Sequence, residues 1–161
     1  MPPAPSLRLD RFIPYRLSVL TNRVSSAIAQ AYAERFGLSI PEWRVIATLG
    51  EQPGMSAAEV AARTAMDKVA VSRAVASLAR AGRLARTRST DDRRRSKLRL
   101  SGAGRAVYAK VAPYALAYEA ALLASLDHRE RETLDRLLDK LSRRAIDLAP
   151  CIISRAAQVP R

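Results

Sequence analysis

Residues 56–82 read SAAEVAARTAMDKVAVSRAVASLARAG, and this stretch decides the fold. Ser56 followed three positions later by Glu59 is a capping-box signature that predicts a two-turn helix. Asp67 is a favourable N-cap for a second helix over residues 68–81, which Gly82 ends. By the 3.6-residue period, one face of the second helix is apolar and is expected in the core, namely Val71, Ala74, Val75 and Leu78. The opposite face is short-chained and cationic, with Val69, Ser72, Arg73, Ala76 and Arg80.

A basic β-hairpin is predicted immediately after this helix pair. Residues 97–100 alternate strictly between basic and apolar side chains, as a half-buried strand does, and residues 83–88 alternate less cleanly. Residues 89–95 form the predicted loop. Nine basic and two acidic residues lie within 80–99, a local charge of +7 against +13 for the whole chain. This arrangement suits a protein that places one helix in a DNA groove and another element along the phosphates.

Further helices are predicted on both sides of this region. Apolar residues recur at three- and four-residue steps over residues 11–36, which predicts one long helix. Ser39 and Glu42 form a second capping box that opens a short helix. Ser101 is a plausible N-cap for another long helix, and Asp127-His128-Arg129-Glu130 opens the last one. The sequence therefore predicts a mainly α-helical protein with one small β-hairpin.

Size and composition narrow the possible classes. A chain of 161 residues is long enough for a single domain, 1–161, with a sizeable core. No run of 18 apolar residues is present, so no membrane span is expected. The basic residues lie on a hairpin rather than on an amphipathic helix, which argues against a membrane-surface role. One cysteine, Cys151, excludes an internal disulfide framework and fits a cytoplasmic protein.

From residue 37 to residue 101 the sequence resembles the winged helix-turn-helix of the MarR (multiple antibiotic resistance regulator) family of bacterial transcription regulators. Four stretches carry the resemblance: residues 38–43, residues 67–73, residues 78–82, and Asp92-Arg93-Arg94 followed after five residues by Leu100-Ser101. The family pattern at the last stretch is Asp-x-Arg-x5-Leu-Thr, so Ser101 replaces the usual threonine. The flanking helices have the family's order and lengths, and the resemblance covers nearly the whole chain.

The resemblance implies a homodimer bound to double-stranded DNA. Residues 39–100 would be the DNA-binding lobe, and residues 7–38 and 101–161 the helical dimerisation region. Two recognition helices would enter successive major grooves of a pseudo-palindromic operator, with half-sites roughly 10 bp apart. Arg94 would enter the flanking minor groove, and Asp92 would orient a wing arginine. The residues expected at the DNA are Ser56, Lys68, Val69, Ala70, Ser72, Arg73, Arg86, Asp92, Arg93, Arg94, Arg95 and Lys97.

The resemblance also implies a small-molecule effector, because family members often bind small aromatic anions between the dimer helices and the DNA-binding lobe. Arg16 and Arg23 are seven residues apart and share one face of the first helix, while Tyr15 and Trp43 could supply aromatic rings. We therefore expect a small aromatic carboxylate, or its thioester, to release the protein, which in such families is most often a repressor. In the alternative interpretation Trp43 belongs to the core and the arginines are solvated or form interfacial ion pairs.

Other functions have weaker support in the sequence. It contains no phosphate-binding glycine loop, nucleophile elbow or metal-ligand spacing, so neither an enzyme nor a cofactor is expected. One histidine, His128, and one cysteine do not make a zinc motif. The remaining alternative is a ligand-independent architectural DNA-binding protein of low sequence specificity. The affinity ratio for an operator over random DNA, and release by a small molecule, would discriminate between the two.

Overall fold

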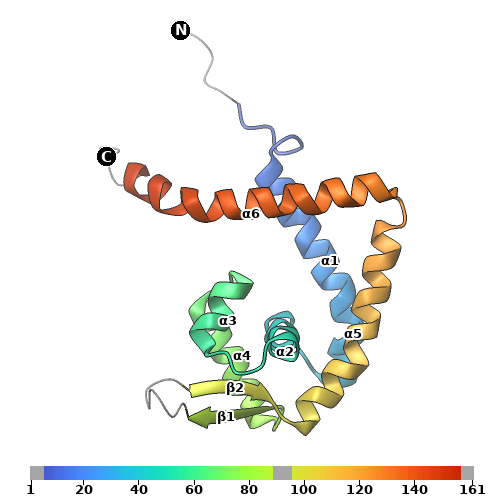
Figure 1. The fold of residues 1–161 in the computed structure, drawn as a ribbon, viewed down its shortest axis with the longest axis vertical. Coiled ribbons are helices and arrows are strands. Elements are labelled where there is room, and N and C mark those ends of the chain that lie inside the picture. The colour runs from blue at the N-terminus through green and yellow to red at the C-terminus, as the bar shows by residue number, and fades with distance from the viewer. Residues whose placement is uncertain (1–5, 89–95, 157–161) are drawn as a thin grey trace. The chain divides into compact units, whose positions relative to one another are not determined.

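The structure, a computed structural model, describes residues 6–88 and 96–156, and in that part of the chain six helices accompany one two-stranded sheet (Figure 1). In chain order the elements are α1 (Ile13–Phe36), α2 (Ile40–Glu51), α3 (Ala57–Thr64), α4 (Lys68–Arg80), β1 (Leu84–Arg88), β2 (Ser96–Leu100), α5 (Gly102–Leu123) and α6 (His128–Ala156). The chain divides into two compact units, Met1–Tyr118 and Glu119–Arg161. The predicted mainly α architecture with a small hairpin is confirmed. Among the described residues, none of the helices has the length and hydropathy that a membrane span requires.

Reciprocal capping boxes begin α2 and α3, as predicted. The Ser39 amide donates to Glu42 Oε2 at 2.7 Å, and the Glu42 amide donates to Ser39 Oγ at 3.4 Å. At the start of α3, the Ser56 amide donates to Glu59 Oε2 at 2.6 Å and the Glu59 amide to Ser56 Oγ at 3.2 Å. Each box satisfies two backbone N–H groups that a helix start leaves without intrahelical partners.

A tight turn separates α3 from α4. Ala65 closes α3 in the left-handed conformation, with φ of 51°. Asp67 then caps α4, because its Oδ1 accepts hydrogen bonds from the amides of Val69 (2.8 Å) and Ala70 (3.1 Å). Gly82, with φ of 66°, follows the end of α4 and turns the chain toward β1. The helix pair predicted from residues 56–82 is therefore confirmed, with both caps.

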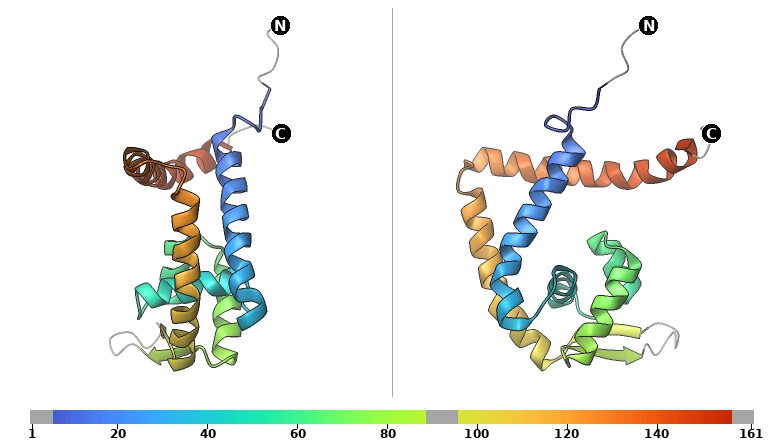
Figure 2. Two further views of the ribbon diagram at one scale, coloured as in Figure 1. Left: turned by 90° about the vertical axis from the view of Figure 1, so that its right-hand side faces the viewer. Right: turned by 180° about the vertical axis from the view of Figure 1, so that it is seen from behind.

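One apolar core joins α2, α3, α4, the hairpin, the start of α5 and, through Tyr32, α1. The ribbon shows α2 enclosed by these elements (Figure 2). The predicted core face of α4 is buried, and Ala74, its most accessible member, is 4% exposed. Side chains that are at most 2% exposed include Val45, Ile46, Leu49, Val60, Val71, Val75, Leu78, Leu98 and Val111. Each large aliphatic side chain buried in this way stabilises the fold by about 1.5–3 kcal/mol. This packing fixes the orientation of α4 on α2 and leaves the opposite face of α4 accessible.

The predicted hairpin forms from β1 and β2, which pair antiparallel with Leu84 opposite Leu100. Leu98 ties the hairpin to the loop after α2, because its amide donates to the Met55 carbonyl at 2.8 Å. The side chains of Leu84, Leu98 and Leu100 are all buried in the core. The hairpin is therefore anchored at its base. The predicted loop 89–95, with Asp92, Arg93, Arg94 and Arg95, lies outside the described residues.

The start of α5 packs closely against the base of the hairpin. Ser101 caps α5 as predicted, since its Oγ accepts from the Gly104 amide at 3.1 Å and donates to the Gly82 carbonyl at 2.6 Å. A Cβ at Gly104 would collide with the carbonyl oxygen of Arg83. Farther along, the Tyr114 hydroxyl accepts a 3.1 Å hydrogen bond from Arg35, near the end of α1. These contacts hold α5 against the loop before β1 and against α1.

Three long helices keep apolar side chains exposed in the single chain. α6 begins at the predicted cap, where the amides of Asp127 and Glu130 each donate to the other's carboxylate at 2.9 Å. Along and beside α1, α5 and α6 the following side chains are between 37% and 74% exposed: Phe12, Ile13, Leu17, Leu20, Tyr114, Leu116, Leu122, Leu134, Leu137, Leu138, Leu141 and Ile146. The apolar stripe predicted on α1 is thus present: Ile13, Leu17 and Leu20 in its first half are exposed, whereas Val24 and Ile28 in its second half are half-buried.

Candidate DNA-binding surface

The outer face of α4 presents the residue types predicted for DNA contact. Lys68, Ser72 and Arg73 are exposed, and Val69 is 55% exposed although it is apolar. Ala70 is half-buried between this face and the core. An exposed apolar side chain beside two cations suits a major groove, where a valine can contact a thymine methyl group and an arginine can pair with guanine. Lys68, Val69, Ser72 and Arg73 therefore form one exposed surface with Ala70 at its edge, which we call the α4 face, while Val71 between them is buried in the core.

A hollow of about 520 Å³ lies beside the α4 face, between the start of α2 and α4. Arg73, Ser77 and Arg80 of α4 line it together with Ser39 and Glu42 of α2. Ser77 was not among the predicted DNA-binding residues, and Arg80 was assigned only to the outer face of the helix. Their spacing of four and seven residues from Arg73 was the available sequence signal, because these positions share a face of α4.

Glu42 is the acidic group of this hollow. Partial burial raises the pKa of its carboxyl, but hydrogen bonds from Ser39 and Ser77 and the nearby charge of Arg83 together hold the pKa below its usual value. Glu42 is therefore ionised at neutral pH, and it accepts hydrogen bonds from Ser39, the N-cap of α2, and from Ser77 on α4. This carboxylate fixes the polar side chains at the edge of the α4 face.

The hairpin separates the two basic residues that were predicted in its strands. Directly paired residues of an antiparallel ladder point to the same side, and sides alternate along each strand. Arg86 pairs with Leu98, whereas Lys97 pairs with Thr87, so Arg86 and Lys97 lie on opposite sides of the hairpin. Both side chains are exposed. The two residues consequently cannot follow the same stretch of phosphates from one side of the ladder.

Ser56 has a structural role that is compatible with a DNA contact. Its Oγ accepts the Glu59 amide at 3.2 Å in the capping box of α3. A serine hydroxyl that accepts one hydrogen bond can still donate another. The structure thus places Ser56 at the start of α3, with a hydroxyl proton that is not needed for the cap.

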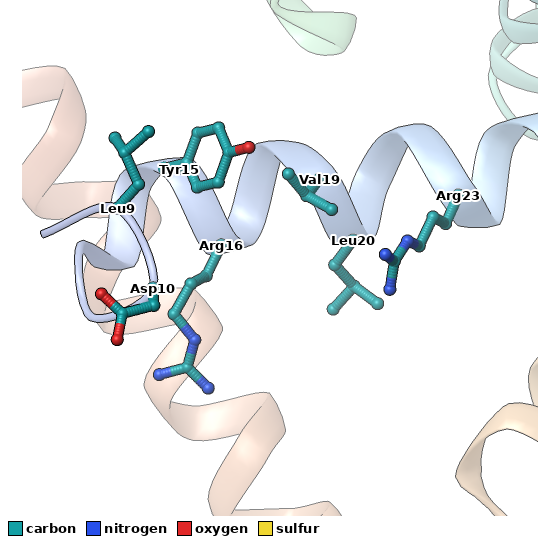
Figure 3. A pocket seen from close by; sticks show the side chains of 7 residues that line it. All are labelled: Leu9, Asp10, Tyr15, Arg16, Val19, Leu20 and Arg23. Carbon is teal, nitrogen blue, oxygen red and sulfur yellow. The ribbon is translucent and has the colours of Figure 1, made fainter.

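The structure divides the predicted effector residues between two places. Tyr15, Arg16 and Arg23 line a hollow of about 230 Å³ at the start of α1 (Figure 3). Asp10 lines the same hollow, and Figure 3 shows its carboxylate on the same side of α1 as the Arg16 side chain. Asp10 also forms a 3.2 Å ion pair with Arg8. This hollow therefore combines arginines with a carboxylate, which weakens its attraction for an anion.

Trp43 does not line the hollow on α1. Its ring centroid lies 5.6 Å from that of Tyr32 on α1 and 6.2 Å from that of Tyr108 on α5. Tyr32 is 1% exposed, and burial raises the pKa of its hydroxyl, which the charge of Arg44 only partly opposes. Trp43 therefore joins three helices through aromatic packing, which matches the interpretation that placed it in the core. Within the described residues, no cluster of three His, Cys, Asp or Glu side chains could hold a metal ion.

Comparison with known proteins shows which proteins this chain is similar to. The family model described as MarR family matches residues 36–95. The HTH-type transcriptional repressor Rv2887 of Mycobacterium tuberculosis is 30% identical over 131 residues, which make up 81% of this chain and 91% of that relative. Among solved structures, the MarR/EmrR family transcriptional regulator from Acinetobacter sp. ADP1 is 26% identical, with a TM-score of 0.81 over 88% of this chain and 99% of that chain. BpsR of Bordetella bronchiseptica, whose DNA binding is regulated by 6-hydroxynicotinic acid, is 23% identical, with a TM-score of 0.74 over 86% and 98% of the two chains.

Proposed function

This chain belongs to the MarR family of transcriptional regulators, and from that premise we propose that it is a homodimeric repressor that a small aromatic acid releases from a pseudo-palindromic operator. Its family and relatives are transcriptional regulators rather than enzymes.

The observation that carries the proposal is the division of α4 into two faces. Val71 and Leu78 are 1% and 0% exposed, whereas Val69, on the other side of the same helix, is 55% exposed. A helix that is anchored so completely on one side can present Lys68 and Arg73 to DNA without moving relative to the lobe. We therefore assign base contacts to the α4 face and phosphate contacts to Ser56, Arg86 and Lys97. Arg93, Arg94 and Arg95 extend the proposal to the loop outside the described residues.

In this proposal, a second copy of the chain packs against the apolar side chains of α1, α5 and α6. These side chains recur on every one of the three helices, and such extensive exposure marks an interaction surface in a soluble protein. A two-fold axis would then repeat the α4 face, and half-sites roughly 10 bp apart would match two successive major grooves.

The proposed effector acts by population shift. An aromatic acid that binds more tightly to a dimer with mismatched α4 spacing would draw the protein away from the operator. The regulation of BpsR by 6-hydroxynicotinic acid, a small aromatic acid, supports this chemical class. Tyr15, Arg16 and Arg23 remain candidate effector residues in this proposal. Trp43 would take part only indirectly, since it lies in the aromatic stack with Tyr32 and Tyr108.

One experiment tests the proposal as a whole. A library of randomised duplexes is selected on the full-length protein, and the affinity for the enriched sequence is compared with that for a scrambled duplex by fluorescence anisotropy. We expect a two-fold symmetric site and a preference of at least about 10³-fold. Benzoate, salicylate and hydroxycinnamate are then titrated into the complex. Equal affinity for the two duplexes, with no release by any acid, would instead support the architectural DNA-binding alternative.

A further inference from the structure

One carboxylate, that of Glu42, lies where the start of α2 meets the outer side of α4. It lines the hollow beside the α4 face together with Arg73, Ser77 and Arg80. We propose that Glu42 is a positioning residue for DNA recognition, because it fixes the rotation of α4 about its own axis and with it the direction of Arg73. This role rests on the proposed reading of an operator by the α4 face, and it assigns part of the sequence specificity to a residue that acts through α4.

The capping box holds the Glu42 side chain in one place on α2. Both the amide and the hydroxyl of Ser39 donate to Glu42 Oε2, at 2.7 Å and 2.8 Å. An ionised carboxylate has two oxygens and about four acceptor positions, so the cap leaves room for a donor from another element. Glu42 therefore presents a fixed acceptor to α4 rather than a side chain that rotates freely.

Ser77 is the group on α4 that meets this acceptor. Its side chain is half-buried, and its hydroxyl donates a hydrogen bond to the Glu42 carboxylate. Ser77 follows Arg73 by four residues and precedes Arg80 by three, so the three side chains share one side of α4. The contact from α2 is thus made between the two arginines, on the side of the helix that faces away from the core.

Arg83 connects the same carboxylate to two further helix ends. Its positive charge acts on Glu42, and its amide donates to the Leu78 carbonyl, in the last turn of α4, at 2.9 Å. Its guanidinium donates to the Phe36 carbonyl, at the end of α1, at 2.6 Å. The Glu42 carboxylate therefore belongs to a polar cluster that joins the end of α1, the start of α2 and the second half of α4.

A directional contact of this kind adds to what the core provides. The buried side chains of α4, such as Val71 and Leu78, hold the helix on the lobe, but hydrophobic contacts have no preferred direction. Side chains reach about 5–6 Å from a helix axis, so a rotation of about 10° moves their ends by about 1 Å. Binding groups have to be held within about 0.5 Å to recognise a partner precisely. A charge-assisted hydrogen bond on the outer side of α4 restricts this rotation.

A direct contact between Glu42 and DNA is the competing interpretation. A carboxylate repels phosphates, so Glu42 would have to accept from a base, as glutamate does from cytosine N4. The two roles differ in their dependence on Ser77. Removing the Ser77 hydroxyl leaves the Glu42 carboxylate and its cap in place, so it impairs a positioning role and spares a base contact.

The test measures the affinity of the full-length protein for the selected operator and for the scrambled duplex, by fluorescence anisotropy at one salt concentration. The variants are Glu42→Gln, in which glutamine still fits a capping box, Ser77→Ala, the double variant, and Ser77→Thr, which keeps a hydroxyl. Glu51→Gln is the matched control, because it removes a carboxylate from the opposite end of α2. Circular dichroism at the assay temperature gives the folded fraction of each variant.

We expect Glu42→Gln and Ser77→Ala each to weaken operator binding about tenfold and to change the affinity for the scrambled duplex by no more than about twofold. The double variant should bind the operator no more weakly than the more affected single variant, because both substitutions remove one interaction. Ser77→Thr should recover most of the loss, and Glu51→Gln should bind both duplexes as the wild-type protein does. A loss of folded protein would instead weaken both duplexes by the same factor.

Three results would overturn the positioning role. In the first, both duplexes weaken equally in Glu42→Gln and Ser77→Ala. In the second, Glu42→Gln lowers the operator preference and Ser77→Ala does not, which would make Glu42 a base contact. In the third, both variants keep the wild-type preference, which leaves the proposed function intact and removes only the role of Glu42. Equal affinity of the wild-type protein for the two duplexes would, by contrast, remove the proposed function itself.

Discussion

The Arg83 guanidinium donates a 2.6 Å hydrogen bond to the carbonyl oxygen of Phe36, 47 positions earlier in the sequence. Phe36 is the last residue of α1, where carbonyl groups lack intrahelical partners and carry partial negative charge. Arg83 stands directly before β1, and its own carbonyl accepts from the Ser101 amide at 3.0 Å. One residue therefore connects the end of α1, the base of the hairpin and the start of α5.

Removing this arginine should destabilise the protein. We expect Arg83→Ala to lower the free energy of unfolding by about 1.5–3 kcal/mol, because a charge-assisted hydrogen bond is lost and the Phe36 carbonyl loses a partner. Urea unfolding at one fixed protein concentration measures the effect, since assembly contributes to apparent stability. The control is Arg86→Ala, on the exposed part of β1, which should stay within about 0.5 kcal/mol of wild type. Equal stability of the two variants would show that the Arg83 bond contributes little.

Gly104 and Gly102 offer a matched test of the close approach between α5 and the hairpin. A Cβ at Gly104 would collide with the Arg83 carbonyl, which is backbone and cannot rotate away, whereas a Cβ at Gly102 would meet nothing. We expect Gly104→Ala to destabilise the fold by about 1–3 kcal/mol. Gly102→Ala should be neutral or stabilise the fold by up to about 1 kcal/mol, because alanine loses less backbone entropy in a helix. Thermal unfolding of both variants measures these effects. A melting temperature of Gly104→Ala equal to that of the wild-type protein would contradict this packing.

The lowered pKa of Glu42 predicts a pH dependence. Because its pKa lies below the usual value of 4.5, folding favours the charged form, and this stabilisation is fully present above about pH 5. It is lost as the pH falls through the pKa of the folded state. We therefore expect the wild-type protein to be more stable than Glu42→Gln at pH 7, with a difference that shrinks steadily below pH 4.5. Urea unfolding across this pH range measures it. A difference in stability that grew as the pH fell would show that folding favours the neutral form of the Glu42 carboxyl group.

The parts of the fold that sequence could predict are the locally determined ones. The capping boxes at Ser39 and Ser56, and the cap at Asp67, involve hydrogen bonds that span only two or three residues. The two faces of α4 follow equally from helical geometry and the pattern of small, apolar and basic residues. For these elements a short window of sequence contains all the interacting groups.

The contacts that sequence could not predict join distant segments. The Arg83–Phe36 bond spans 47 residues, and the stack of Trp43 on Tyr108 spans 65. The sequence places Arg16, Arg23 and Trp43 on adjacent helices, which suggests a shared site. In the structure Trp43 contacts α1 at Tyr32, whereas Arg16 and Arg23 line the hollow at the start of this long helix.

The exposed apolar helices predict a dimer in solution. Leu141 on α6 is 50% exposed in the single chain, and we expect a second copy of the chain to cover it. Light scattering at micromolar concentration should give the mass of two chains, and Leu141→Arg should shift it toward one chain by placing a charge in the interface. Asp139→Arg puts the same side chain on the opposite side of α6 and should keep the dimer. A wild-type monomer would also remove the basis for two half-sites.

Two variants, Arg73→Ala and Lys97→Ala, should distinguish contacts with DNA bases from contacts with DNA phosphates. Arg73 lies on the α4 face, so its loss should cost about 1–3 kcal/mol on the selected operator and much less on a scrambled duplex. Lys97 is exposed on the hairpin, so its loss should weaken both duplexes by similar factors and reduce the slope of log affinity against log salt by about 1. Anisotropy titrations at several salt concentrations measure both, with Lys110→Ala on α5 as the control for a lost positive charge. If Arg73→Ala weakens the two duplexes equally, Arg73 positions the protein on phosphates, and sequence is read by other residues.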